Sequence, residues 1–274
     1  MKSFALFACL FLGLSSIVHA ATYTNIDFPR AGLTSANGIN NSGVIVGEYL
    51  TSAIHGFIFN AGVYTTVDFP VTGASTWCEG INDNGDIVGF YEGASSLDIH
   101  GFLLKDGVFT ALDFPGSIMT QAYGINNAGQ IVGSYSTGVG VQGFTYQDGV
   151  YTDVTVPTAT YTDLRGIDSF GDMVGYYTRS LSHGLLVSGG VDRSVDVPGA
   201  IESFASSVND LKAVAGYYDV TGNTLGFVRF RGTLVTITVP GGVEVHVLGI
   251  NNNMLTVGYY NDSQNLTHGF LRTP

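Results

Sequence analysis

Seven residues of unlike chemistry lie one or three positions before a recurring glycine, at places where the copies of a sequence repeat differ. They are Trp77, Glu79, Gln121, Tyr123, Asp163, Arg165 and His246. Aromatic rings beside hydrogen-bonding groups are typical of sites for carbohydrates and other small polar ligands. We therefore predict that these side chains line a pocket. We expect the changes Trp77→Ala and Arg165→Ala to abolish ligand binding with little change in melting temperature.

An enzyme is the alternative to a binding module. Glu79, Asp163 and His246 could act as acid, base or metal ligand in a hydrolase or a polysaccharide lyase with a small axial active site. The sequence contains no nucleophile elbow, phosphate-cradling loop or HExxH motif that would favour a particular reaction. A structural matrix protein without a small ligand is the third possibility.

The elements that must position these residues are six copies of one unit. Prolines spaced 41 to 45 residues apart mark its phase, and each closes a phrase such as TNIDFP or TTVDFP: Pro29, Pro70, Pro115, Pro157, Pro198 and Pro240. A fixed period of this length indicates one supersecondary unit copied in series. Every copy contains four short runs rich in β-branched and aromatic residues, separated by Gly, Asn and Asp turns, which is typical of antiparallel strands.

Four strands in about 42 residues is the size of a propeller blade. The sequence therefore predicts an all-β fold, a six-bladed β-propeller, with residues 21–274 as a single domain. The N-terminal strand is expected to join the C-terminal blade and close the ring, which would cover two sheet edges. An open β-solenoid is the rival. The short turns share one face of the ring, and the variable loops share the other, where we expect function to lie.

The phrases GINNSGVIVG and HGFIF resemble the HAF-type extracellular repeats of bacterial secreted proteins, over essentially all of residues 22–274. Gly replaces the alanine of the His-Ala-Phe motif here, as in His55-Gly56-Phe57, and Gln142 and Leu225 replace the histidine in two copies. The resemblance implies an exported repeat protein. It implies no activity, because that family has no assigned biochemical function.

Polar residues that recur in every copy are expected to be structural. Four histidines share one repeat position, a blade's width apart, too far to ligate one metal ion, and each is expected to bond a backbone group: His55, His100, His183 and His268. Aspartates before the prolines are expected to cap backbone N–H groups, with a calcium-binding carboxylate ring as the alternative: Asp27, Asp68, Asp113 and Asp196. Tyrosines that end the second run are expected to be structural, with an aromatic platform for sugars as the alternative. We predict no metal cofactor, and calcium stays the alternative.

Composition limits the compartment and the partners. Residues 1–20 have the form of a signal peptide that ends at Val18-His19-Ala20, so we expect a secreted or periplasmic protein. Loss of Lys2 would take the net charge from −12 to −13, which disfavours nucleic acid and anionic membranes as partners. We expect no membrane insertion, a monomer, and a glycan or a cell-surface protein as partner. Cys78 would be the one cysteine left, so no intrachain disulfide can form.

Overall fold

The computed structural model describes residues 21–93 and 99–274, and in this part of the chain every regular element is a β-strand. The expected signal segment, residues 1–20, and residues 94–98 of one expected loop lie outside the described residues. The all-β prediction is confirmed. Within the described ranges there is no helix that could span a membrane.

Successive strands form antiparallel units of four. The first two units contain β2 (Leu33–Ile39), β3 (Ile45–Leu50), β4 (Ile54–Asn60), β5 (Val63–Val67), β6 (Ser75–Ile81), β7 (Ile87–Glu92), β8 (Ile99–Lys105) and β9 (Val108–Leu112). The next two contain β10 (Met119–Ile125), β11 (Ile131–Ser136), β12 (Gln142–Gln147), β13 (Val150–Val154), β14 (Tyr161–Ile167), β15 (Met173–Thr178), β16 (Ser182–Ser188) and β17 (Val191–Ser194). The remaining strands are β18 (Glu202–Val208), β19 (Val214–Val220), β20 (Asn223–Phe230), β21 (Thr233–Ile237), β22 (Gly242–Ile250), β23 (Thr256–Asp262), β24 (Thr267–Thr273) and β1 (Thr22–Asn25).

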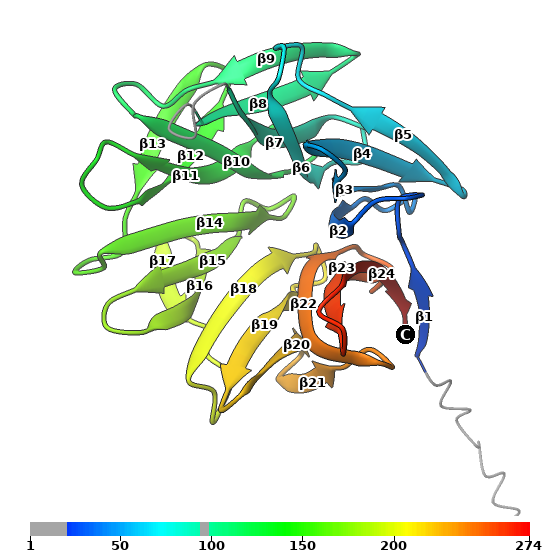
Figure 1. The fold of residues 1–274 in the computed structure, drawn as a ribbon. Coiled ribbons are helices and arrows are strands. Elements are labelled where there is room, and N and C mark those ends of the chain that lie inside the picture. Colours follow the sequence, from blue (N-terminus) through cyan, green and yellow to red (C-terminus); the bar gives the residue numbers. More distant parts are fainter. Residues whose placement is uncertain (1–20, 94–98) are drawn as a thin grey trace, which may run out of the picture.

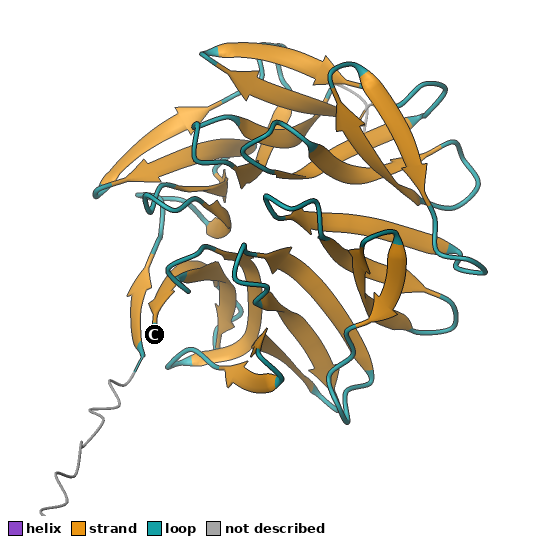
Figure 2. Ribbon diagram, turned by 180° about the vertical axis from the view of Figure 1, so that it is seen from behind, coloured by secondary structure: helices purple, strands orange, loops and turns teal. Residues whose placement is uncertain are grey.

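The units stand around a common axis, with β2, β6, β10, β14, β18 and β22 innermost (Figure 1; Figure 2 gives the opposite view). Single parallel pairings link some neighbours into eight-stranded sheets, as where Met119 lies opposite Ile99. The first strand of the chain pairs with the last: β1 lies antiparallel to β24, with Asn25 opposite Phe270. Beyond β1, the Ile26 N–H donates to the carbonyl of Gly269 at 2.8 Å.

The core lies between neighbouring units. Each innermost strand buries an apolar side chain two residues before its recurring glycine or serine, with at most 1% exposed: Ala36, Cys78, Ala122, Leu164, Ala205 and Val247. The sequence predicted burial at this position, and the structure confirms it. Cys78 packs with Val46 of the preceding unit and with Phe102 of its own unit. Adjacent units therefore share their core, and each needs its neighbour to bury its apolar face.

A β-bulge in every innermost strand sets the geometry of the axis. The pairing register between first and second strands shifts just before the glycine, for example between Cys78 and Gly80. The shift leaves one unpaired residue per strand, because a bulge sets two residues opposite one. Its side chain turns toward the axis. The glycine that follows allows the strands to approach, since a Cβ on Gly80 would lie 2.5 Å from the carbonyl oxygen of Tyr123.

The recurring histidines pair with the recurring aspartates of the proline phrases. His55 Nδ1 lies 2.9 Å from Asp68 Oδ1, and the same pair recurs in the units of His100, His183 and His268. The prediction of a backbone partner was therefore wrong, because the pairing of the third and fourth strands brings the aspartate carboxylate within hydrogen-bond distance of Nδ1. Asp196 also accepts a hydrogen bond from the Gly184 N–H, as a cap would. Gln142 and Leu225, which replace the histidine, occur in units whose phrase has threonine in place of aspartate.

Candidate functional site

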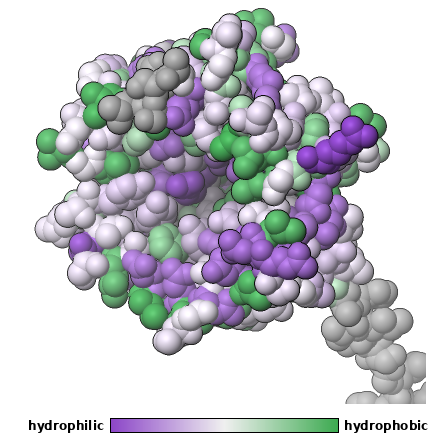
Figure 3. Space-filling model, viewed as in Figure 1, coloured by the Kyte–Doolittle hydropathy of each residue, from purple (hydrophilic) through white to green (hydrophobic). Residues whose placement is uncertain are grey.

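The bulge residues line a central cavity that runs along the axis. Figure 3 shows the hollow at the centre of the molecule. A larger chamber of about 110 Å³ and a smaller one of about 40 Å³ adjoin there. All six bulge residues line both chambers: Asn37, Glu79, Tyr123, Arg165, Ser206 and Leu248. They therefore form the constriction between the two, and each copy of the repeat contributes one side chain to it.

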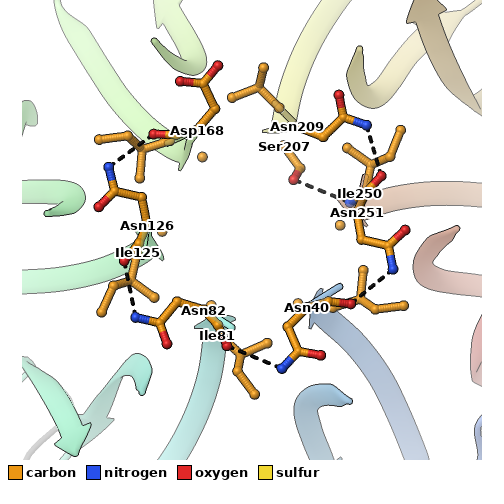
Figure 4. A pocket seen from close by; sticks show the side chains of 18 of the residues that line it. Asn40, Ile81, Asn82, Ile125, Asn126, Asp168, Ser207, Asn209, Ile250 and Asn251 are labelled. Carbon is orange, nitrogen blue, oxygen red and sulfur yellow. Dashed lines mark hydrogen bonds between the residues drawn. The ribbon is translucent and has the colours of Figure 1, made fainter. Parts of the chain in front are cut away.

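A ring of asparagines surrounds the larger chamber (Figure 4). Each donates its Nδ2–H to the backbone carbonyl of the matching residue in the next unit, as Asn40 does to Asn82 at 3.2 Å and Asn82 to Asn126 at 3.1 Å. The same bond recurs from Asn126 to Asp168, from Asn209 to Asn251 and from Asn251 to Asn40. These residues begin the short first-to-second turns, so the larger chamber lies at the turn face. Sequence reasoning had pointed to the opposite, loop face.

Asp168 interrupts this ring. Its carboxylate caps its own turn by accepting from the N–H groups of Phe170 and Asp172, as the asparagines do in theirs. A carboxylate without a proton donates no hydrogen bond, so it cannot repeat the amide contact to the next unit. Lys212 of that unit reaches back instead and places Nζ 2.6 Å from Asp168 Oδ2 and 2.8 Å from Asp172 Oδ2. Five of the six junctions are thus amide hydrogen bonds, and one is ionic.

Asp163 is fully buried and forms an ion pair beside the smaller chamber with Arg165, whose side chain is 31% exposed. Arg165 Nη2 lies 2.8 Å and Nε 3.0 Å from Asp163 Oδ2, and the aspartate side chain is 0% exposed. The guanidinium also lies over the ring of Tyr123, 3.8 Å from its centroid. Asp163 Oδ1 is buried and completes no hydrogen bond. Because Asp163 depends on this one cation, Arg165→Ala will lower stability, which revises the expectation that the melting temperature would hardly change.

Sequence reasoning missed the second-strand residues that face the axis. They follow the Val-Gly or Ala-Gly pair of each second strand and lie opposite the residues three before the recurring glycine: Glu48, Phe90, Ser134, Tyr176, Tyr217 and Tyr259. Trp77 stacks on Phe90 with ring centroids 4.8 Å apart, and His246 stacks on Tyr259 at 4.4 Å. The available signal was cross-strand register, since residues opposite each other on antiparallel strands share a face.

The seven predicted residues separate into two groups. Glu79, Tyr123 and Arg165 are bulge residues and line the cavity. The other four belong to the adjoining layer, where each lies opposite a second-strand residue: Trp77, Gln121, Asp163 and His246. The bulge explains the division, because it places two residues that are two positions apart in a strand at different depths along the axis.

Acidic groups outnumber cations in this axial cluster. Burial raises the pKa of Glu79 to about 7, although Arg165 opposes the shift. Burial and the charge of Glu79 raise the pKa of Glu48, whose carboxylate accepts from Asn37 Nδ2. Burial also raises the pKa of Asp163 despite its arginine, and burial lowers the pKa of His246 to about 4. In the described ranges, no group of three or more His, Cys, Asp or Glu residues is placed to hold a metal ion.

The raised pKa of Glu79 makes stability depend on pH. The folded state holds the Glu79 proton up to about pH 7, whereas the ordinary glutamate value is 4.5, so this group stabilises the fold most at acid pH and loses that contribution as pH rises through 7. We expect the free energy of unfolding of Glu79→Gln, relative to that of the wild type, to be higher at pH 8 than at pH 4.5 by roughly 3 kcal/mol. This follows from about 1.4 kcal/mol for each unit by which the pKa is raised. Urea unfolding of both proteins at each pH measures the difference. Asp148→Asn, on an exposed turn, is the control, and equal slopes for all three proteins would refute a buried titrating Glu79.

No known protein family and no curated sequence matches the chain. Several solved structures resemble it. Virginiamycin B lyase from Staphylococcus aureus is 12% identical, with a TM-score of 0.52 over 91% of this chain and 88% of that one. A mutant Aleuria aurantia lectin in complex with Fucα1-6GlcNAc is 9% identical, with a TM-score of 0.56 over 88% and 93%. The β-propeller domain of the Trilobed protease from Pyrococcus furiosus is 8% identical, with a TM-score of 0.54 over 90% and 94%. At these identities the likeness concerns the fold alone, and the fold is that of a β-propeller.

Proposed function

We propose that this chain is an exported binding module, a six-bladed β-propeller whose ring is closed by β1 on the last blade. Its ligand is a small polar molecule, and a glycan is the ligand class that we propose first. The observation that carries the proposal is the axial cluster. There the repeat loses its symmetry, and charged side chains that are buried or half-buried lie beside aromatic rings. A purely structural ring would gain from apolar residues at these positions, because buried charges cost free energy unless they are fully paired.

The chemistry of the cluster favours a ligand rich in hydrogen-bond donors. Glu79 lines both chambers and offers acceptor oxygens beside the Arg165 guanidinium, while Glu48 and the fully buried Asp163 belong to the adjoining layer. Sugar hydroxyls could donate to the Glu79 carboxylate, and the neighbouring rings of Tyr123 and Tyr176 suit the apolar face of a sugar. The smaller chamber, about 40 Å³, has room for little more than one water-sized group. A glycan would therefore insert one edge of one ring.

Two of the similar structures are of a lectin whose ligands are sugars. One is a fucose-specific lectin from Aleuria aurantia, and another is a lectin complex with a fucose-containing disaccharide. These support a glycan as the first ligand class to test. We also propose that the chain belongs among the HAF-type repeats of secreted proteins, that it acts as a monomer outside the cytoplasm, and that a cell-surface protein is the other partner class.

Filling the cavity tests the axial site. Leu248 lines both chambers, and Leu248→Trp adds a bulky ring at the constriction. We expect a glycan array, run with and without calcium, to identify a ligand of the wild type, and Leu248→Trp to weaken that binding at least tenfold. Val108→Trp, on an outer strand where Val108 is 64% exposed, is the matched control. If both variants bind like the wild type, the ligand does not use the axis.

An extracellular lyase or hydrolase is the second candidate. The specific observation is the pKa of Glu79, about 7, which suits proton transfer at neutral pH. Virginiamycin B lyase and a streptogramin B lyase are among the similar folds. Turnover of a bound ligand that Glu79→Gln abolishes, while binding persists, would favour catalysis over simple binding.

If β1 closes the ring, two isoleucines at equivalent positions should contribute equally to stability. Ile26 and Ile237 occupy the same repeat position, and each is at most 1% exposed. If β1 is the fourth strand of the last blade, Ile26→Ala and Ile237→Ala should each lower the free energy of unfolding by about 2–5 kcal/mol. Thermal and urea unfolding give both values. A much smaller loss for Ile26→Ala would mean that the N-terminal strand is dispensable and the ring open.

A further inference from the structure

A second cavity lies away from the axis, between the outer part of one four-stranded unit and the last unit. Its volume is about 450 Å³, within the range of roughly 300–1,000 Å³ that is usual for small-molecule sites. Its lining is mainly apolar and comes from β20, β21, the turn between β22 and β23, and the end of β24: Val228, Phe230, Arg231, Thr233, Val235, Met254, Arg272 and Pro274. It is several times larger than the axial chambers.

Phe230 departs from the repeat at this groove. It ends the third strand of its unit, where other units end with a polar or charged residue: Asn60, Lys105, Gln147, Ser188 and Thr273. Phe230 is only partly buried and packs against the core of the last units. An aromatic ring at a position that is polar in every other copy serves the groove rather than the repeated scaffold.

Met254 departs from the repeat in the same groove. Four units have glycine at this turn position, with φ between 78° and 86°: Gly43, Gly85, Gly129 and Gly171. Met254 keeps the same left-handed backbone, with φ of 62°. A side chain in this region costs about 1 kcal/mol or more, and such strain clusters at functional sites. The retained strain therefore indicates that the Met254 side chain has a use, and it forms a wall of the groove.

Two arginines add positive charge to this apolar lining. Arg272 stands where four other units have an apolar residue: Phe59, Leu104, Tyr146 and Val187. Its Nε atom is buried and has no hydrogen-bond partner. Arg231 lies over the ring of Phe230, with Cζ 4.9 Å from the centroid. The chain has 10 lysines and arginines in all and a net charge of −12, so two arginines at one groove mark it as a place for an anion.

We propose that this groove binds an apolar molecule that carries one carboxylate, of the chemical class of medium-chain fatty acids. The alkyl chain packs on Phe230, Val235 and Met254, and the carboxylate accepts hydrogen bonds from Arg272, with Arg231 at the rim. Arg272 lines the groove, so its terminal guanidinium N–H groups are the donors for this carboxylate. The arginine–carboxylate contact is charge-assisted and can be bidentate, which makes it stronger than a neutral hydrogen bond.

Sodium octanoate and 1-octanol are the paired probes for this site. We expect octanoate to bind one site per chain, at least tenfold more tightly than octanol, as measured by calorimetry and by the shift of the Met254 methyl signal in the protein labelled at methionine. Hexanoate should bind about tenfold more weakly than octanoate, because two buried methylenes are lost. Octanol binding as tightly as octanoate, or no binding of either, would overturn the proposal.

The test variants introduce residues that other copies of the repeat carry at the same position, so the variants are expected to fold. Arg272→Leu copies Leu104 and should remove the preference for octanoate over octanol, while Met254→Gly copies four other units and should weaken both probes. Lys105→Ala, at the position equivalent to Phe230 in another unit, should leave binding unchanged. Retention of the octanoate preference in folded Arg272→Leu would refute the assigned carboxylate partner. Dimerisation of the wild type that blocks octanoate would assign the groove to a second copy of the chain.

Discussion

Replacement of Arg165 by methionine is expected to lower the free energy of unfolding by about 3–5 kcal/mol, because it strands a buried carboxylate. Asp163 is 0% exposed, and its Oδ2 depends on the guanidinium at 2.8 Å. Methionine keeps much of the packing volume but leaves this charge without a partner. Urea unfolding at pH 7 measures the loss, and the loss should shrink at acid pH as the carboxyl takes a proton.

A second change, at Asp163, distinguishes the effect of the lost positive charge from the effect of altered packing. The double variant Arg165→Met with Asp163→Asn should recover most of the lost stability, since a neutral amide is far less costly to bury than a lone carboxylate. Arg193→Met, at an exposed arginine on β17, should change stability by no more than about 0.5 kcal/mol. If the double variant is as unstable as the single one, packing by Arg165 and not its charge holds this part of the axis.

Gly133→Ala is expected to cost about 3 kcal/mol or more, because no space exists for a methyl group. An added Cβ would lie 2.0 Å from the carbonyl oxygen of Gln121 and 2.7 Å from the ring of Phe144. The oxygen belongs to the paired strand β10, so relief would require the two strands to separate. Thermal unfolding should show a large fall in melting temperature.

Gly129→Ala is the matched control for this change. Gly129 has a φ of 78°, and an added Cβ would meet no atom within 4 Å, so only backbone strain of about 1 kcal/mol is expected. The difference between the two alanine variants then isolates the contact with the neighbouring strand. Equal losses would mean that β10 and β11 can relax around the extra methyl group.

The fold was largely predictable because the same sequence signals recur in six copies of the repeat. Prolines in phase, Gly, Asn and Asp turns, and short runs of β-branched and aromatic residues all pointed to four antiparallel strands per copy, and the paired strands confirm this. The buried position occupied by Cys78 and Ala122 was predicted correctly, since only apolar residues occur there. The histidine partner was predicted wrongly. His55 and Asp68 lie 13 residues apart in sequence, and only the pairing of β4 with β5 brings them together.

The axial site was only half predictable. Alternation along a strand correctly turned Glu79, Tyr123 and Arg165 away from the buried face, but it cannot reveal a bulge. The bulge brings these three to the cavity and leaves Trp77 in the adjoining layer. Glu48 was missed because its significance comes from the cross-strand neighbour Ser35 and from Asn37, not from its own segment.

The interrupted ring of asparagines has a consequence for the response to ionic strength. Five contacts of this ring are neutral amide hydrogen bonds, which dissolved salt screens little. The one at Asp168 is the ion pair with Lys212, whose side chain is 46% exposed, and it lies beside hydrogen bonds from Ser169 to Asp210. Salt shortens the reach of exposed charges to about 8 Å at physiological concentration and about 3 Å at 1 M. Concentrated salt should therefore weaken the contact between the units β14–β17 and β18–β21 more than the other five contacts of this ring. Asp168→Asn would restore the amide of the other five positions and should reduce this salt dependence, with the Lys212–Asp172 ion pair left in place.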